Sequence, residues 1–281
     1  MIFGAVPVDD ALGAISVHAV RTAGAVIKKG ATISAREISL LREAGIASIV
    51  VAKLEPEDIG EDEAAAALAQ VLCGDGIRAA PAATGRANLF AMQSGILQIN
   101  VDAVHAINRL DEAVTLATLP AMKPVVAGEM IATVKIVPFG IARRLSEAAV
   151  AQAAADRPLR IAPYCLTRVG MISTRLPGLN ETIIDKTVRV TAERLAVANA
   201  MIVHEARVPH DTSALTQAIK DALQARVEMI LIFGASAIAD RHDVIPAAIE
   251  AGGGSIIHFG MPVDPGNLLL LAHCGDVPVI G

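Results

Sequence analysis

Hydrophobic and polar positions along the N-terminal part of the chain predict short, mixed elements. Ser34 and Glu37 form a capping box that opens a helix, because each side chain can accept a hydrogen bond from the other residue's main-chain amide. Gly45 ends that helix in a left-handed conformation. A buried strand over 46–52 follows, and the acidic first turn of 61–72 predicts a second helix.

The pattern changes between residues 77 and 138, where Pro and Gly separate short apolar runs. These runs predict strands at 87–90, 96–101, 114–116 and 130–137, with one helix near 102–110. The Ala-rich stretch 142–155 predicts a further helix, which Asp156-Arg157-Pro158 ends. We therefore expect the main domain boundary at this point.

From Leu159 onward the chain alternates regularly between strand and helix patterns. The first strand is either 159–163 or the apolar stretch 169–173. The later elements are helices at 181–199, from Asp211-Thr212 and at 244–251, and strands at 201–204, 227–233, 255–259, 268–272 and 277–280. The strand 227–233 is almost uniformly apolar, as expected when both faces are covered. Repeated strand–helix–strand units predict a doubly wound, mostly parallel sheet.

The expected organisation is an α/β protein with three parts. Residues 1–76 form a mixed α/β region, and residues 77–157 form a strand-rich subdomain with a connecting helix. Residues 158–281 form the α/β domain with the doubly wound sheet. Thr84, Arg86, Asn88 and Lys135 are secondary candidates for a ligand contact, and surface hydrogen bonding is the alternative for them.

Composition excludes several classes of function. Hydrophobic residues make up 53% of the 281 residues and charged residues 19%, so disorder is excluded. The net charge is −5 without a basic arm, and aromatic residues make up 2%, so we expect no nucleic-acid partner. Cys73, Cys165 and Cys274 are too far apart for a disulfide framework or a CxxC metal site. There is no export signal and no apolar run of about 20 residues, so we expect a cytoplasmic protein without membrane contact.

Two loops should leave the carboxyl edge of the sheet, where open α/β sheets bind ligands. In the first loop, Gly234, Ala235, Ser236 and Ala237 are small enough for their main-chain amides to approach an anion closely. The alternative is that these small residues only permit tight packing. In the second loop, Pro265-Gly266 is a turn signal that Asp264 and Asn267 flank with hydrogen-bonding groups.

Charged residues follow the small ones in the first loop. Asp240 and Asp243 could hold a divalent cation or bind a ring nitrogen, and Arg241 could neutralise a phosphate. The alternative for Asp243 is a helix cap. His242 stands out only for its position. No GxGxxG fingerprint, P-loop or nucleophilic triad supports a competing site.

The segment from Gly234 to Pro246 resembles the Gly-Gly-x-(Gly/Ser)…Asp-Val motif of the molybdopterin-binding domain family, which includes molybdopterin molybdotransferase, molybdopterin adenylyltransferase and gephyrin. The resemblance covers about residues 159–281. The strings at 234–237, 240–246 and 260–267 are most similar to bacterial molybdopterin-binding proteins that carry a C-terminal cytidylyltransferase-like domain, absent here. Those relatives continue beyond a Pro-Val-x-Gly string, so we expect the native chain to extend past Gly281.

The resemblance implies a pterin ligand, molybdopterin or its nucleotide form, and a role in molybdenum cofactor biosynthesis or maturation. It implies that amides of 234–237 hold the pterin phosphate and that Asp240 and Asp243 serve as catalytic and Mg²⁺-binding residues of a transferase. It further implies a homo-oligomer and a fused or separate cytidylyltransferase partner.

Whether the chain is an enzyme stays open. The molybdotransferase has lysines beside the Pro-Gly turn where this chain has Asp264 and Asn267. Lysine attracts anions and aspartate repels them, which favours a non-catalytic carrier or regulatory module that presents the pterin to a nucleotidyltransferase. A dimeric scaffold with a vestigial site is the third alternative.

Overall fold

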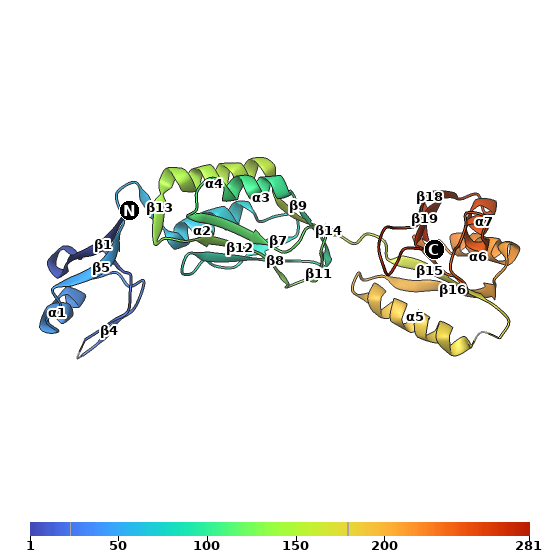
Figure 1. Cartoon of the computed structure of the whole chain (residues 1–281), viewed down its shortest axis with the longest axis horizontal. Coiled ribbons are helices and arrows are strands. Elements are labelled where there is room, and N and C mark those ends of the chain that lie inside the picture. The colour runs from blue at the N-terminus through green and yellow to red at the C-terminus, as the bar shows by residue number, and fades with distance from the viewer. Residues whose placement is uncertain (23, 179) are drawn as a thin grey trace. The chain divides into compact units, whose positions relative to one another are not determined.

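The computed structural model describes residues 1–22, 24–178 and 180–281, and the chain divides into two compact units, Met1–Pro163 and Tyr164–Gly281 (Figure 1). The division lies between Pro163 and Tyr164, whereas the sequence pattern predicts it between residues 157 and 158. Among the described residues, no helix combines the length and apolar character that a membrane span requires.

The first part of the N-terminal unit is a small sheet with one helix. Its elements are β1 (Ile2–Pro7), β2 (Ile15–Ser16), β3 (Val20–Arg21), β4 (Val26–Ile27), α1 (Ala35–Glu43) and β5 (Ser48–Lys53). The sheet order is β1-β5-β2, and β3 pairs with β4. The predicted capping box is confirmed at Ser34 and Glu37, and Gly45 has the expected positive φ of 68°. Ile33, Leu41 and Val51 form part of the core beneath α1.

The rest of the unit packs helices on a four-stranded sheet. Its elements are β6 (Asp58–Gly60), α2 (Glu61–Val71), β7 (Ile77–Ala79), β8 (Arg86–Ala91), β9 (Gly95–Ile99), α3 (Val101–Asn108), β10 (Val114–Thr118), β11 (Pro124–Val125), β12 (Met130–Ile136), β13 (Gly140–Ala142), α4 (Arg143–Asp156) and β14 (Leu159–Pro163). The main sheet has the order β10-β12-β8-β7, beside a β11-β9-β14 sheet and a β13-β6 pair. Leu68 of α2 shares one core with Leu89 of β8, although the sequence predicts a division between residues 76 and 77.

The secondary candidates lie in or beside β8 and β12, and three of them have hydrogen-bond partners within this unit. Lys135 donates to the Thr84 carbonyl oxygen at 2.6 Å, and Thr133 donates to Asn88 Oδ1 at 2.9 Å. Arg86 lies opposite Lys135 in the register of β8 and β12. These contacts support the hydrogen-bonding alternative for Thr84, Asn88 and Lys135.

The C-terminal unit is built on a six-stranded sheet. Its elements are β15 (Arg168–Arg175), α5 (Glu181–Ala196), β16 (Met201–Pro209), α6 (Thr212–Gln224), β17 (Met229–Phe233), α7 (Val244–Ala251), β18 (Ser255–Phe259), β19 (Leu270–Cys274) and β20 (Val277–Ile280). The order is β16-β15-β17-β20-β19-β18. The first four strands are parallel and β19 runs antiparallel to both its neighbours. The predicted α/β class with a mostly parallel sheet is confirmed. Of the two candidates for its first strand, 169–173 lies in this sheet and 159–163 is β14, which pairs with β9.

The strand order gives this sheet a topological switch point, where the connections leave in opposite directions along the sheet. β16 and β17 lie on opposite sides of β15. Right-handed crossovers then place α5 on one face and α6 on the other, which opens a crevice at the carboxyl ends of these strands. The two predicted loops leave this edge.

The two faces of the sheet differ in how well they are covered. Ile219 of α6 and Ile249 of α7 are fully buried against Ile230 and Ile232 of β17. On the other face Phe233 is 36% exposed, and α5 buries only Ile184 among its described residues. The expectation that both faces of 227–233 are covered is therefore wrong for this unit. The reason is that α5 packs mainly along the edge strand β16.

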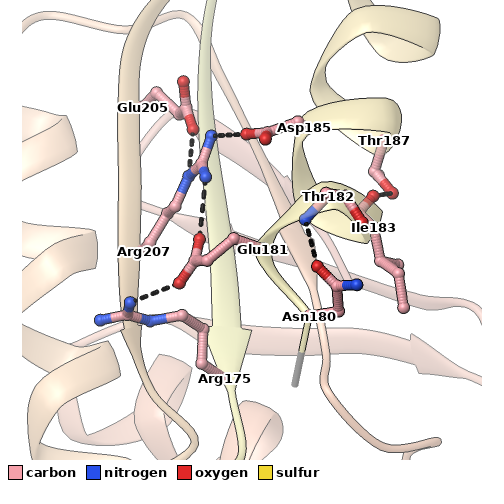
Figure 2. A network of polar contacts seen from close by, with 9 residues as sticks. All are labelled: Arg175, Asn180, Glu181, Thr182, Ile183, Asp185, Thr187, Glu205 and Arg207. Carbon is pink, nitrogen blue, oxygen red and sulfur yellow. Dashed lines mark hydrogen bonds and ion pairs between the residues drawn. The ribbon is translucent and has the colours of Figure 1, made fainter. Parts of the chain in front are cut away.

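A charged network fixes the start of α5 to the sheet (Figure 2). Arg207 of β16 pairs with Glu181 at 2.9 Å, Asp185 at 2.8 Å and Glu205 at 2.7 Å. Arg175 of β15 also pairs with Glu181, at 2.8 Å. Hydrogen bonds from Arg175 and then Arg207 hold the pKa of Glu181 below its ordinary value. These ion pairs connect the first turns of α5 to β15 and β16.

We expect Arg207→Met to loosen α5. The substitution leaves three carboxylates near one arginine, and like charges repel. Hydrogen exchange measured by mass spectrometry should show faster exchange for the first turns of α5 and no change in α7. Arg194→Met, in the last turn of α5, is the matched control and should leave exchange in those first turns unchanged. Equal exchange in both variants would contradict the anchoring role.

Candidate functional site

A pocket of about 520 Å³ lies at the carboxyl edge of the C-terminal sheet, between the two predicted loops. Gly234, Ser236 and Ala237 of the first loop line it, together with Gly266 and Asn267 of the second. Its remaining wall is apolar and comes from residues 231–233, 238, 245, 268, 269, 280 and 281. The size is within the usual range for a small-molecule site. The other predicted site residues do not line it: Ala235, Asp240, Arg241, Asp243, Asp264 and Pro265.

Gly234 permits the tight turn from β17 into the first loop. A Cβ atom at this position would lie 2.7 Å from the Ser236 carbonyl oxygen and 2.9 Å from Ile245 Cδ1. Both distances are too short for any side chain. The glycine therefore brings the loop backbone against α7, and the requirement is close approach, since φ at Gly234 is not positive.

The loop amides divide into two groups. The Ala235 N–H donates to Thr174 Oγ1 at 2.8 Å, and the Ala239 N–H donates to Asp243 Oδ2 at 3.1 Å. The Ser236 and Ala237 N–H groups have no acceptor within the described part of the chain. Two of the amides predicted to bind an anion are thus open to a ligand, and they lie on the pocket wall.

Asp243 caps α7. Its Oδ1 accepts from the Val244 N–H at 2.7 Å, while Oδ2 accepts from Ala239. These main-chain hydrogen bonds, Ala239 first and then Val244, hold the pKa of Asp243 below its ordinary value. The capping alternative raised for this residue matches the structure.

Asp240 is engaged within its own loop. Its Oδ1 accepts from the His242 N–H at 2.8 Å and contacts His242 Nδ1 at 2.7 Å. These contacts, the main-chain one first, lower the pKa of Asp240. Over the described ranges, no group of three or more His, Cys, Asp or Glu side chains could hold a metal ion. Metal binding by Asp240 and Asp243 stays a prediction.

Thr174 and His210 do not line the pocket but bond to its wall at Ser236, and no motif in the sequence marks them. Thr174 Oγ1 lies 2.9 Å from His210 Nδ1, and His210 Nε2 lies 3.2 Å from Ser236 Oγ. Thr174 belongs to β15, His210 follows β16 and Ser236 follows β17, so three neighbouring strands contribute one residue each. In the sequence, Thr174 and His210 are marked only by their position at the carboxyl end of a strand. That position indicates a shared site only when the strand order is known.

The second loop is a compact turn. Gly266 has a φ of 111°, and the Asp264–Pro265 peptide is cis. The Met261 N–H donates to the Asn267 carbonyl oxygen at 2.9 Å, and the Leu269 N–H donates to that of Gly266 at 3.1 Å. The Asn267 side-chain amide has no partner among the described residues, so it can bond to a pocket ligand.

Comparison with known proteins assigns no family to the chain as a whole. Residues 5–53 match a domain of unknown function, DUF8806, which lies outside the C-terminal unit. No curated protein matches.

Solved structures give only distant likenesses. CinA, a protein with unknown function from Thermoplasma acidophilum, is similar at 10% identity and a TM-score of 0.32, over 41% of this chain and 86% of its own. A molybdenum cofactor biosynthesis protein from Pyrococcus furiosus is similar at 12% identity and a TM-score of 0.25, over 99% of this chain and 56% of its own. NadC from Streptococcus pyogenes is similar at 14% identity and a TM-score of 0.19, over 69% of this chain and 79% of its own.

We expect Gly234→Ala to destabilise the protein by about 1–3 kcal/mol, because the new methyl group overpacks the turn. Urea denaturation followed by circular dichroism measures this. Gly4→Ala is the matched control, since a Cβ at Gly4 has nothing within 4 Å. Equal stability of the two variants would show that the close approach at Gly234 is absent.

We expect Asp243→Ala to cost about 1 kcal/mol near neutral pH, the usual value for losing an N-cap. The folded pKa is depressed, so the stabilisation exists above the unfolded pKa and is lost as pH falls through the folded one. The difference between wild type and variant should therefore shrink below about pH 4. Urea midpoints across pH measure it, with Asp276→Ala as the control. A difference independent of pH would contradict the charged cap.

Proposed function

We propose that the C-terminal unit binds a phosphate-bearing pterin of the molybdopterin class and acts in molybdenum cofactor biosynthesis or maturation. The observation that carries this proposal is the pocket lined by Ser236 and Ala237, whose N–H groups have no acceptor among the described residues, and by Asn267 of the second loop. The sequence resemblance at 234–246 and 260–267 supplies the ligand class.

The pocket offers different chemistry at its two ends. At the first loop, two open amides and the Ser236 hydroxyl provide hydrogen-bond donors for phosphate oxygens. The apolar wall, including Leu231, Phe233 and Ile280, suits a flat heteroaromatic ring. The Asn267 amide can both donate and accept, as the edge of a pterin ring requires.

The non-catalytic carrier or regulatory module is the form of the proposal that the side chains favour. Asp243 uses both carboxylate oxygens to accept main-chain N–H groups, and Asp240 uses Oδ1 in the same way. The Arg241 N–H also contacts the Asp240 carboxylate. This donor set does not fit Mg²⁺, which requires several oxygen ligands in octahedral geometry.

Calorimetric titration with a pterin phosphate and with the same pterin lacking phosphate tests the proposal. We expect the phosphorylated compound to bind the wild-type protein at least tenfold more tightly, which corresponds to about 1.4 kcal/mol. Asn267→Leu should weaken both ligands by roughly tenfold, because one polar contact to the ring is lost.

Gln224→Leu is the matched control, since Gln224 lies at the end of α6 and not on the pocket wall. It should bind both ligands as the wild type does. No binding of either compound would refute the proposed function, and equal binding of both would refute the phosphate role of the first loop.

A further inference from the structure

The three hydrogen bonds between Ala235, Thr174, His210 and Ser236 have a direction that the surroundings dictate. Thr174 is 2% exposed, so its hydroxyl hydrogen needs an acceptor inside the protein. The Ala235 N–H already donates to Thr174 Oγ1 at 2.8 Å. Among the described residues, the one acceptor in reach of that hydroxyl hydrogen is His210 Nδ1, at 2.9 Å.

This direction selects the tautomer of His210. A neutral imidazole carries its hydrogen on one nitrogen, and the other nitrogen accepts. Because Nδ1 accepts from Thr174, the hydrogen lies on Nε2 and points to Ser236 Oγ at 3.2 Å. The lone pair of Ser236 Oγ on that side is thus occupied. The Ser236 hydroxyl hydrogen is left free to point elsewhere, and Ser236 lies on the pocket wall.

The geometry points to Thr174 and His210 as positioning residues that make the Ser236 hydroxyl a hydrogen-bond donor to the ligand. Together with the Ser236 and Ala237 amides, this hydroxyl gives the first-loop end of the pocket three donors. Such an end selects an acceptor-only group, an oxyanion such as a phosphate monoester, and disfavours a neutral hydroxyl or an amine. The inference rests on the proposed function for the identity of the ligand. The hydrogen-bond direction itself does not depend on it.

We call the hydrogen bonds from Thr174 through His210 to Ser236 the relay. The relay also distinguishes His210 from a catalytic base. In a serine nucleophile pair, the imidazole nitrogen that faces the hydroxyl accepts its proton. Here that nitrogen, Nε2, carries the hydrogen, and no carboxylate orients Nδ1 because Thr174 bonds to it. His210 therefore orients Ser236 and does not activate it.

Nuclear magnetic resonance of the ligand-free full chain tests the relay directly. The ¹⁵N shifts of the imidazole ring separate the two tautomers, and we expect His210 in the Nε2–H form. Observation of the Nδ1–H form would overturn the inference. This measurement uses the wild-type protein, so it does not depend on whether any variant folds.

Binding by two variants of Thr174 tests the consequence for the ligand. Thr174→Val removes the hydroxyl and keeps the shape, and Thr174→Ser keeps the hydroxyl. We expect Thr174→Val to lose roughly tenfold in affinity for the pterin phosphate and to bind the phosphate-free pterin unchanged, with Thr174→Ser close to wild type. An equal loss for both ligands would mean a merely structural role and would overturn the inference. If the wild type binds no pterin at all, the proposed function fails. The tautomer of His210 still tests the direction of the hydrogen bonds from Thr174 to Ser236.

Discussion

The close approach of the main chain at Gly234 is the constraint on which the carboxyl edge of the C-terminal sheet depends. With no Cβ at this position, the Ser236 carbonyl oxygen and Ile245 can lie against the end of β17. The turn then directs Ala235 toward Thr174 and leaves Ser236 and Ala237 on the pocket wall. A side chain at 234 would force the loop outward and separate these groups. The absence of a Cβ at Gly234 therefore permits both the close packing against Ile245 and the hydrogen bond from Ala235 to Thr174.

Local signals in the sequence predicted much of the fold because they act over a few residues. The capping box at Ser34 and Glu37 and the helix 244–251 depend only on neighbouring residues, and both are present as predicted. The coverage of β17 was mispredicted because it depends on where α5 lies in space. An apolar strand reads the same in sequence whether one face or both faces are covered.

The candidate site was also predictable only where it depends on residues close together in the sequence. Small residues at 234–237 and the turn at 265–266 marked two loops, and the pocket lies between them. Thr174 and His210 could not be selected, because only the order β16-β15-β17 brings their strand ends together. The carboxylates of Asp240 and Asp243 have the composition of a metal site but serve as hydrogen-bond acceptors for the loop and for α7. Composition alone does not distinguish these uses.

A crystal structure with a pterin phosphate bound tests the central claim most directly. The account predicts phosphate oxygens within hydrogen-bond distance of the Ser236 and Ala237 amide nitrogens and of Ser236 Oγ, with the ring against Leu231 and Phe233. Density for the ligand elsewhere on the chain, or a phosphate turned away from these amides, would contradict it.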